Sequence, residues 1–195
     1  MNIIYLLLFV AVIIILWAIS VFNFFVSSKA RIKASVQEIG NQLKRQAELI
    51  PNLEESTKGY LKHEKNIFAD LTQARKAVAS ASKGGDLQKM ADAGSKFADV
   101  LSRLQVIVES NPEIKASEVV NNLMNELRDT SDKVMYARRL LIDLTADFNI
   151  KRATFPSSII ASVFKFEELP GLIAPEKGGH VEITEAETKT PKVNF

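Results

Sequence analysis

Residues 3–22 read IIYLLLFVAVIIILWAISVF, and this stretch decides the architecture because no side chain in it carries a charge. Twenty residues in a helix rise about 30 Å, which matches the hydrocarbon thickness of a bilayer. Fifteen of them are Ile, Leu, Val or Phe, and each favours insertion by roughly 0.3–0.6 kcal/mol near the membrane centre. The stretch therefore predicts a transmembrane helix.

A cleaved secretory signal is the alternative interpretation of the same residues. Such a signal has a basic start, a shorter apolar core and small residues at its cleavage site. Only Met1 and Asn2 precede the apolar core here, and residues 21–26 (VFNFFV) contain no such site. We therefore expect the helix to stay attached as a membrane anchor.

Basic residues flank the predicted span on one side only. Lys29, Arg31 and Lys33 follow it, whereas no Lys or Arg precedes it. Positively charged flanks stay preferentially in the cytoplasm. This asymmetry predicts that the short N-terminus lies outside and that the soluble part is cytoplasmic.

The overall composition excludes several classes of function. Lys and Arg number 25 and Asp and Glu 23, and both signs are mixed along the chain, so no field of one sign is expected to attract nucleic acid. The absence of cysteine excludes disulfides, thiol redox chemistry and thiolate metal sites.

Four apolar seams follow the predicted span, with successive members three or four residues apart. They run through residues 32–50, 53–81, 87–108 and 120–148. This spacing is typical of helices packed along their length in a bundle or coiled coil. Because the connections are short, we predict an all-α fold with an N-terminal transmembrane helix followed by an antiparallel, up-and-down four-helix bundle.

Proline and capping residues predict where these helices begin and end. Pro51 interrupts the first seam, and Asn52 with Glu55 resembles a capping box that would start the second helix. A single long helix kinked at Pro51 is the structural alternative. The remaining boundaries are marked by Gly84, Gly85, Asp86, Asn111, Pro112, Ser117 and Pro156.

The chain is predicted to have three parts. Residues 1–28 hold the N-terminus and the span, and residues 29–166 hold the bundle with a short C-terminal helix. Residues 167–195 are predicted to be disordered, because turn formers and polar residues leave little apolar surface to bury. The apolar segment 157–166 either caps the open end of the bundle or forms an interfacial helix that contacts the membrane.

The sequence offers little for catalysis. His63-Glu64 begins like a zinc-protease helix motif, but Ile67 stands where the second histidine belongs, and the other histidine of the chain is His180. A catalytic zinc site needs three protein ligands. We therefore expect no catalytic, cofactor or metal site and no enzymatic activity, with a hydrolase using His63 and Glu64 as a remote alternative.

One polar residue lies on an otherwise apolar seam and therefore needs a partner. Glu64 occupies the second seam, where burial of an unpaired charge is costly. Arg75, Arg138 and Arg139 are basic residues able to pair with it, and His63 adjoins it. These five residues are predicted to form a buried polar network, either an ion pair that sets helix register or a polar pocket for a ligand or peptide.

Short segments between residues 23 and 166 carry a family resemblance. They are Gln42-Leu43-Lys44-Arg45, Leu49-Ile50-Pro51-Asn52-Leu53, Lys58-Gly59-Tyr60, His63-Glu64, Ala74-Arg75, Glu109, Pro112, Lys115-Ala116, Ala137-Arg138-Arg139, Phe148-Asn149, Phe155-Pro156, Ala161 and Phe164-Lys165-Phe166. In order and spacing these segments resemble the LemA family of bacterial membrane proteins. Leu141-Ile142 departs from the Tyr-Asn usual in that family, so any polar contact of that pair is missing here.

The resemblance implies an anchored bundle on the cytoplasmic side of the bacterial inner membrane, and it implies no reaction. Some relatives serve membrane remodelling or organelle formation, and others accompany membrane proteases. We therefore expect a non-enzymatic scaffold or adaptor. Its expected partners are the lipid bilayer, other membrane proteins including a membrane protease, and further copies of itself. A ligand-sensing module with a polar pocket is the alternative.

Overall fold

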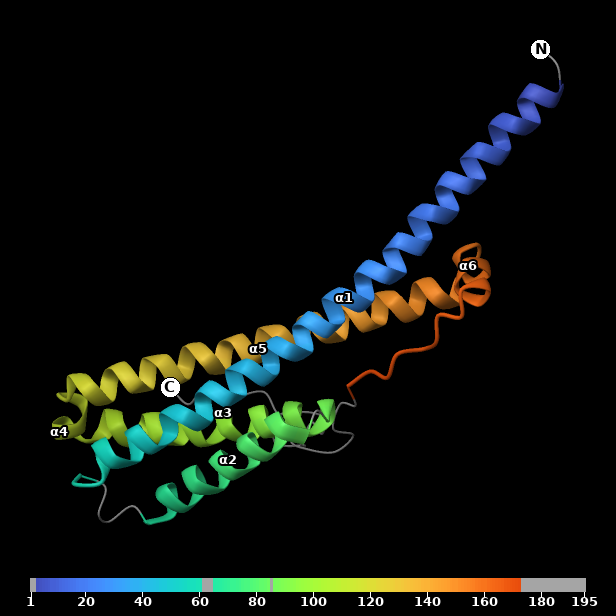
Figure 1. Cartoon of the computed structure of the whole chain (residues 1–195). Helices are drawn as coiled ribbons and strands as arrows, with labels where there is room; N and C mark the ends of the chain where they lie inside the picture. The colour runs from blue at the N-terminus through green and yellow to red at the C-terminus, as the bar shows by residue number, and fades with distance from the viewer. Residues whose placement is uncertain (1–2, 61–64, 85, 173–195) are drawn as a thin grey trace, which may run out of the picture.

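The computed structural model describes residues 3–60, 65–84 and 86–172, and these residues are mostly helical with no strand among them. The predicted all-α class is thereby confirmed. The helices are α1 (Ile3–Thr57), α2 (Lys65–Gly84), α3 (Leu87–Ser110), α4 (Pro112–Lys115), α5 (Glu118–Ala153) and α6 (Ser157–Val163) (Figure 1).

The 55 residues of α1 pass through two different environments. Every side chain from residue 3 to residue 16 is exposed, and α1 is long and apolar enough to cross a membrane. Beyond Val21 one face of the same helix is buried against the rest of the protein. The N-terminal part accordingly extends away from the other helices in Figure 1. The predicted boundary at residue 28 therefore lies inside a continuous helix.

The second half of α1 lies at the centre of the helical packing. It contacts both α5 and α2 along their length, α2 packs on α3, and α3 reaches α5. The core between them consists mostly of seam residues, as the periodicity predicted, and also contains Ala93, Val100, Ile114 and Met124. Its largest fully buried members include Ile39, Leu43, Ile50, Leu53, Leu71, Phe97, Leu104 and Leu127.

The position of the first helix end corrects the sequence prediction. Pro51 lies inside α1, which continues to Thr57, so the predicted helix start at Asn52 is wrong. The alternative of one helix that continues through Pro51 holds for α1 as far as Thr57, beyond which α2 is a separate helix. Leu53 and Thr57 are fully buried, and the Thr57 hydroxyl donates to the Leu53 carbonyl at 2.7 Å. Burial of the Leu53 side chain, which contributes roughly 1.5–3 kcal/mol, opposes the roughly 3 kcal/mol that an interior proline costs.

The cap of α3 forms as predicted. The carboxylate of Asp86 accepts hydrogen bonds from the backbone N–H groups of Gln88 at 3.1 Å and Lys89 at 3.2 Å. The Lys89 backbone bond is the main reason that the pKa of Asp86 lies below its usual value of 3.8. The connection from α2 to α3 is therefore set by local capping chemistry.

The connection between α3 and α5 contains one more turn of helix than the sequence indicated. Asn111 ends α3 and caps α4, whose Ile114 is fully buried. Ser117 then caps α5 as predicted, accepting from the Val120 N–H at 3.4 Å. At its other end α5 stops at Ala153, as expected from the nearby proline. The short helix α4 closes the end of the core farthest from α6 (Figure 1).

Two glycines mark close approaches between helices, and they differ in how much space surrounds them. A Cβ atom built on Gly94 of α3 would lie 2.8 Å from Cγ1 of Val134 and 3.7 Å from Cδ2 of Leu43. A Cβ atom built on Gly40 of α1 would meet only the flexible end of Met90, at 3.8 Å. The crossing of α1, α3 and α5 at Gly94 therefore leaves no room for a side chain.

We predict opposite effects for Gly94→Ala and Gly40→Ala. At Gly94 the overpacking cost of about 1–3 kcal/mol exceeds the gain in helix propensity of roughly 1 kcal/mol, so the free energy of unfolding falls. At Gly40 the propensity gain is unopposed, so the free energy of unfolding rises. Urea unfolding of the full chain in detergent, followed by circular dichroism, measures both. Equal stability of the two variants would contradict the close packing at Gly94.

Candidate functional site

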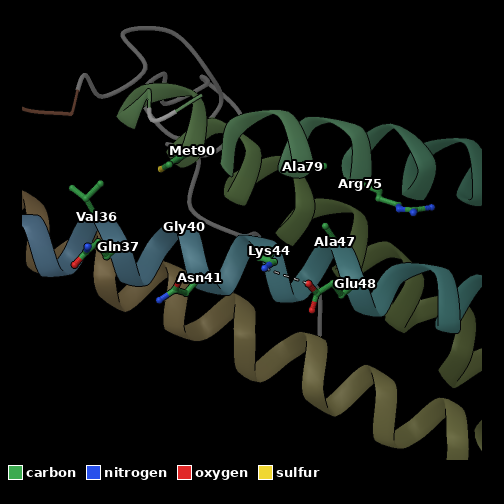
Figure 2. A pocket seen from close by; sticks show the side chains of 10 residues that line it. All are labelled: Val36, Gln37, Gly40, Asn41, Lys44, Ala47, Glu48, Arg75, Ala79 and Met90. Atoms are coloured by element: carbon green, nitrogen blue, oxygen red, sulfur yellow. Dashed lines mark ion pairs between the residues drawn. The ribbon is translucent and has the colours of Figure 1, made fainter. Parts of the chain in front are cut away.

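A groove of about 850 Å³ lies between α1, α2 and α3 (Figure 2). Gln37, Asn41, Lys44 and Glu48 of α1 line one wall with polar atoms. Their spacing of four, three and four residues places them on one face of α1, beside the buried seam. One face of α1 therefore packs in the core, and the adjacent polar face lines the groove.

The groove carries more positive than negative charge. Figure 2 shows Arg75 of α2 across the groove from Lys44 and Glu48. The Lys44 ammonium and the Glu48 carboxylate are 4.0 Å apart and largely exposed, so their attraction contributes at most about 1 kcal/mol. Arg75 is exposed and forms no ion pair with any described residue. The arrangement suits a small anionic group or an acidic peptide segment.

The members of the predicted polar network differ in burial, and two of them are not described by the structure. His63 and Glu64 lie outside the described residues, so the network as a whole stays a prediction. Arg75 and Arg139 are exposed. Arg138 is partly buried, and its guanidinium donates to the Ser95 hydroxyl at 2.8 Å, which joins α5 to α3. Among the described residues, no cluster of His, Asp and Glu suited to a metal ion is found.

A buried amide that the sequence analysis missed lies on the seam of α1. Gln46 is fully buried, and neither its nitrogen nor its oxygen has a hydrogen-bond partner among the described residues. Its place in the 39, 43, 46, 50 spacing could have identified it, since a polar residue at a seam position is unusual. The residue lines no part of the groove.

A cluster of aromatic rings joins α1 to the end of α5 and to α6. Phe25 is fully buried, stacks on Phe166 at 4.7 Å between ring centroids, and meets Phe148 edge-on at 5.2 Å. Val21 and Ala161 complete the buried part of the cluster. We call residues 148–169 the α5–α6 corner. Its contacts to α1 hold the two longest helices together at one end.

The chain turns back after α6 through a left-handed residue. Lys165 has a φ of 53°, the Phe166 N–H donates to the Ala161 carbonyl at 2.9 Å, and the Lys165 N–H donates to the Ser162 carbonyl at 3.2 Å. This pair of bonds is a Schellman motif, which satisfies the last carbonyls of a helix. The turn directs the ring of Phe166 into the aromatic cluster.

Asn149 fixes the segment that follows α6. Its side-chain amide donates to the Leu169 carbonyl at 2.9 Å and accepts from the Leu169 N–H at 3.0 Å. Arg152 adds a hydrogen bond to the Phe166 carbonyl at 3.0 Å and an ion pair with Glu168 at 3.6 Å. Residues 167–172 thus have defined contacts, although the sequence assigned them to a disordered tail that begins at 167. Residues 173–195 lie outside the described part.

We predict that Asn149→Leu releases residues 167–172 from α5. Loss of both bonds to Leu169, each contributing about 0.5–1.5 kcal/mol, should speed local amide hydrogen exchange about tenfold or more. Asn149→Asp keeps the acceptor and loses the donor, so its effect should be smaller. Exchange measured by mass spectrometry over this segment tests the prediction.

Asn121→Leu provides the matched control for this measurement. Asn121 is also a partly buried asparagine of α5 that donates to a backbone carbonyl, that of Lys115, but at the opposite end of the helix. Its substitution should leave exchange over residues 167–172 unchanged. If both variants accelerated exchange over residues 167–172 equally, the effect would come from general destabilisation of the protein and not from loss of the Asn149 bonds.

The fold and these contacts define a class of protein. It is an all-α chain in which one apolar N-terminal helix, able to span a membrane, continues into the core of a helical domain. The chain belongs to the LemA family, whose family model matches residues 35–195. The resemblance inferred from the sequence is confirmed, and family membership together with the apolar helix is consistent with a membrane protein.

One curated relative is the magnetosome protein MamQ of Magnetospirillum gryphiswaldense. It is 22% identical over 171 residues, which cover 76% of this chain and 63% of the relative. The chain therefore matches less than two thirds of the length of that protein. Several residues that carry the resemblance, among them Phe148, Asn149, Ala161 and Phe166, lie together in the α5–α6 corner.

Proposed function

We propose that this protein is a non-enzymatic, membrane-anchored scaffold or adaptor that acts through contacts with membrane proteins or with further copies of itself. The observation that carries the proposal is the continuity of α1. One helix provides both the exposed apolar segment and the central element of the packed domain. A rigid link of this kind restricts the domain to the membrane surface and raises its effective concentration toward membrane partners.

The domain attached to the anchor is proposed to be an antiparallel four-helix bundle of α1, α2, α3 and α5. Contacts of α1 with α2 and α5, of α2 with α3, and of α3 with α5 support this arrangement. Exposed apolar side chains on α5, such as Tyr136 (70%) and Met135 (56%), support a role in association, because apolar groups in water favour burial against a partner.

The soluble domain is proposed to face the cytoplasm of a bacterial cell, with the N-terminus outside. Lys29, Arg31 and Lys33 support this orientation, since they follow the apolar segment of α1 and are exposed.

We predict that the tagged full chain, cross-linked in intact membranes and extracted in detergent, is recovered with defined membrane proteins or with copies of itself. An unrelated single-pass protein with the same tag, expressed at the same level, serves as the control. Because the chain has no cysteine, Val119→Cys also reports orientation. An impermeant thiol reagent should label this variant only after the inner membrane is opened.

Recovery of neither the chain itself nor any membrane protein beyond the control would contradict the scaffold proposal. Labelling of Val119→Cys in cells with an intact inner membrane would contradict the cytoplasmic orientation. The two outcomes are independent, because the first concerns association and the second concerns topology.

A ligand-sensing module is the second candidate, and the groove between α1, α2 and α3 favours it. Its volume suits a small molecule, and Arg75 supplies a cation that forms no ion pair with the described residues. A ligand bound there would contact α1 and α2 at once. Binding would thereby couple to the position of the α2–α3 pair relative to the anchor helix.

We predict for this candidate that an anionic metabolite raises the thermal stability of the full chain in detergent. A ligand present at one hundred times its Kd stabilises a protein by about 2.7 kcal/mol. Arg75→Ala should remove the shift, whereas Arg139→Ala, which changes an exposed arginine outside the groove, should preserve it. Flat thermal responses across a metabolite panel would remove the ligand-sensing candidate.

A further inference from the structure

We propose that the α5–α6 corner lies in the interface of the bilayer leaflet from which α1 emerges, so that the protein contacts the membrane at a second place. The occupant of this surface is lipid. The inference rests on the proposed function in one respect, since it requires α1 to span the membrane.

The first argument is the position of α6 along α1. The ring of Phe22 lies 4.7 Å from that of Phe164 and 5.8 Å from that of Phe166, between centroids. Phe22 is the last residue of the predicted span, and Trp17 of the same span also packs against this cluster. About 9 Å of the span, from residue 17 to residue 22, thus has α6 and its neighbours beside it.

Because α6 packs beside the end of the predicted span, the position of that end fixes how deep α6 lies in the membrane. The first charged residue after the span is Lys29, so no charged residue separates the residues that contact α6 from the membrane-crossing part. A helix fixed to the end of a transmembrane segment lies at the depth of that segment's end. The α5–α6 corner is therefore placed at the boundary between hydrocarbon and headgroups.

The second argument is the chemistry of the outer surface of the corner. Phe155, Ile159 and Val163 follow one another at intervals of four residues and are 81%, 53% and 68% exposed. Phe164 is 53% exposed and Ile150 60%. Such a concentration of exposed apolar side chains is unfavourable in water. A surface with this composition gains stability when it enters the interfacial region of a bilayer.

The third argument is the charge around this apolar surface. Lys151 lies with its ammonium 5.4 Å above the ring of Phe24, and the Lys29 ammonium lies 5.3 Å from the ring of Phe166. Lys165 is exposed in the turn after α6. Lysines bordering an apolar patch extend toward headgroup phosphates while their stems stay on apolar surface.

Two acidic residues belong to the same corner. Glu168 pairs with Arg152 at 3.6 Å, and Glu167 is exposed and lines a hollow together with Arg152 and Lys165. The three lysines and Arg152 outnumber these two carboxylates, so positive charge predominates at this end of the domain. This charge is complementary to anionic lipid headgroups.

Single-cysteine variants test the inference, because the chain contains no cysteine. Val163→Cys is placed in the proposed contact, Ile13→Cys in the exposed apolar part of α1, and Val119→Cys at the opposite end of α5. Each variant of the full chain carries an environment-sensitive fluorophore and is reconstituted into vesicles of phosphatidylethanolamine and phosphatidylglycerol. Quenching is measured with lipids that carry a spin label near the headgroup or near the chain end.

We expect the label at Val163 to emit at shorter wavelength than the label at Val119 and to be quenched most by the spin label near the headgroup. The label at Ile13 should be quenched most by the spin label near the chain end, and the label at Val119 by neither lipid. The label at Ile159→Cys, one turn earlier on the same surface, should give the same result as the label at Val163. Agreement between the two variants excludes a folding defect of one of them as the cause.

Two outcomes overturn the inference. If the label at Ile13 is quenched by lipid but the labels at Val163 and Ile159 are not, α1 is anchored and the corner lies outside the bilayer. If the corner labels are protected from aqueous iodide yet unaffected by spin-labelled lipid, protein covers the surface instead of lipid. Absence of quenching at Ile13 shows in contrast that the anchor itself, and with it the proposed function, has failed.

Discussion

The structure depends on one constraint, the continuity of α1 across the change from exposed apolar surface to packed core. Between residues 3 and 39, α1 contains neither proline nor glycine, so this part of the helix has no local cause for a sharp kink. The buried seam that begins at Val21 therefore fixes both the packing partners of α1 and the direction in which its apolar segment leaves the domain. Because α1 is continuous from Ile3 to Thr57, no separate linker joins the apolar segment to the domain.

The aromatic cluster at the α5–α6 corner strengthens this constraint where the two environments meet. Offset and edge-to-face ring pairs contribute roughly 0.5–1.5 kcal/mol each beyond the area they bury. Two of the ring pairs of Phe25 connect different elements, one with Phe148 of α5 and one with Phe166 beyond α6. The end of α5 is thereby joined to α1, and Asn149 joins the following segment to α5. The position of this end of α5 is therefore coupled to that of α1.

Polar groups of the helical domain lie in two contrasting environments. The groove between α1 and α2 is lined by exposed charges, whereas Gln46 is buried one face away with no partner among the described residues. A buried amide without hydrogen bonds costs about 1–3 kcal/mol. Buried polar groups are retained in some helical proteins because they specify register, and the seam position of Gln46 is compatible with that role.

The sequence by itself determined the apolar segment, the helical class, the seams and the caps at Asp86 and Ser117, because these depend on composition, periodicity and contacts within a few residues. Only the tertiary structure decided that α1 passes through Pro51, that Arg75 faces a groove, and that the corner packs on α1. Each of these depends on residues distant in the chain: burial of neighbouring side chains outweighs the local cost of proline, and ring contacts across helices place α6. Local patterns carry no information about such long-range contacts.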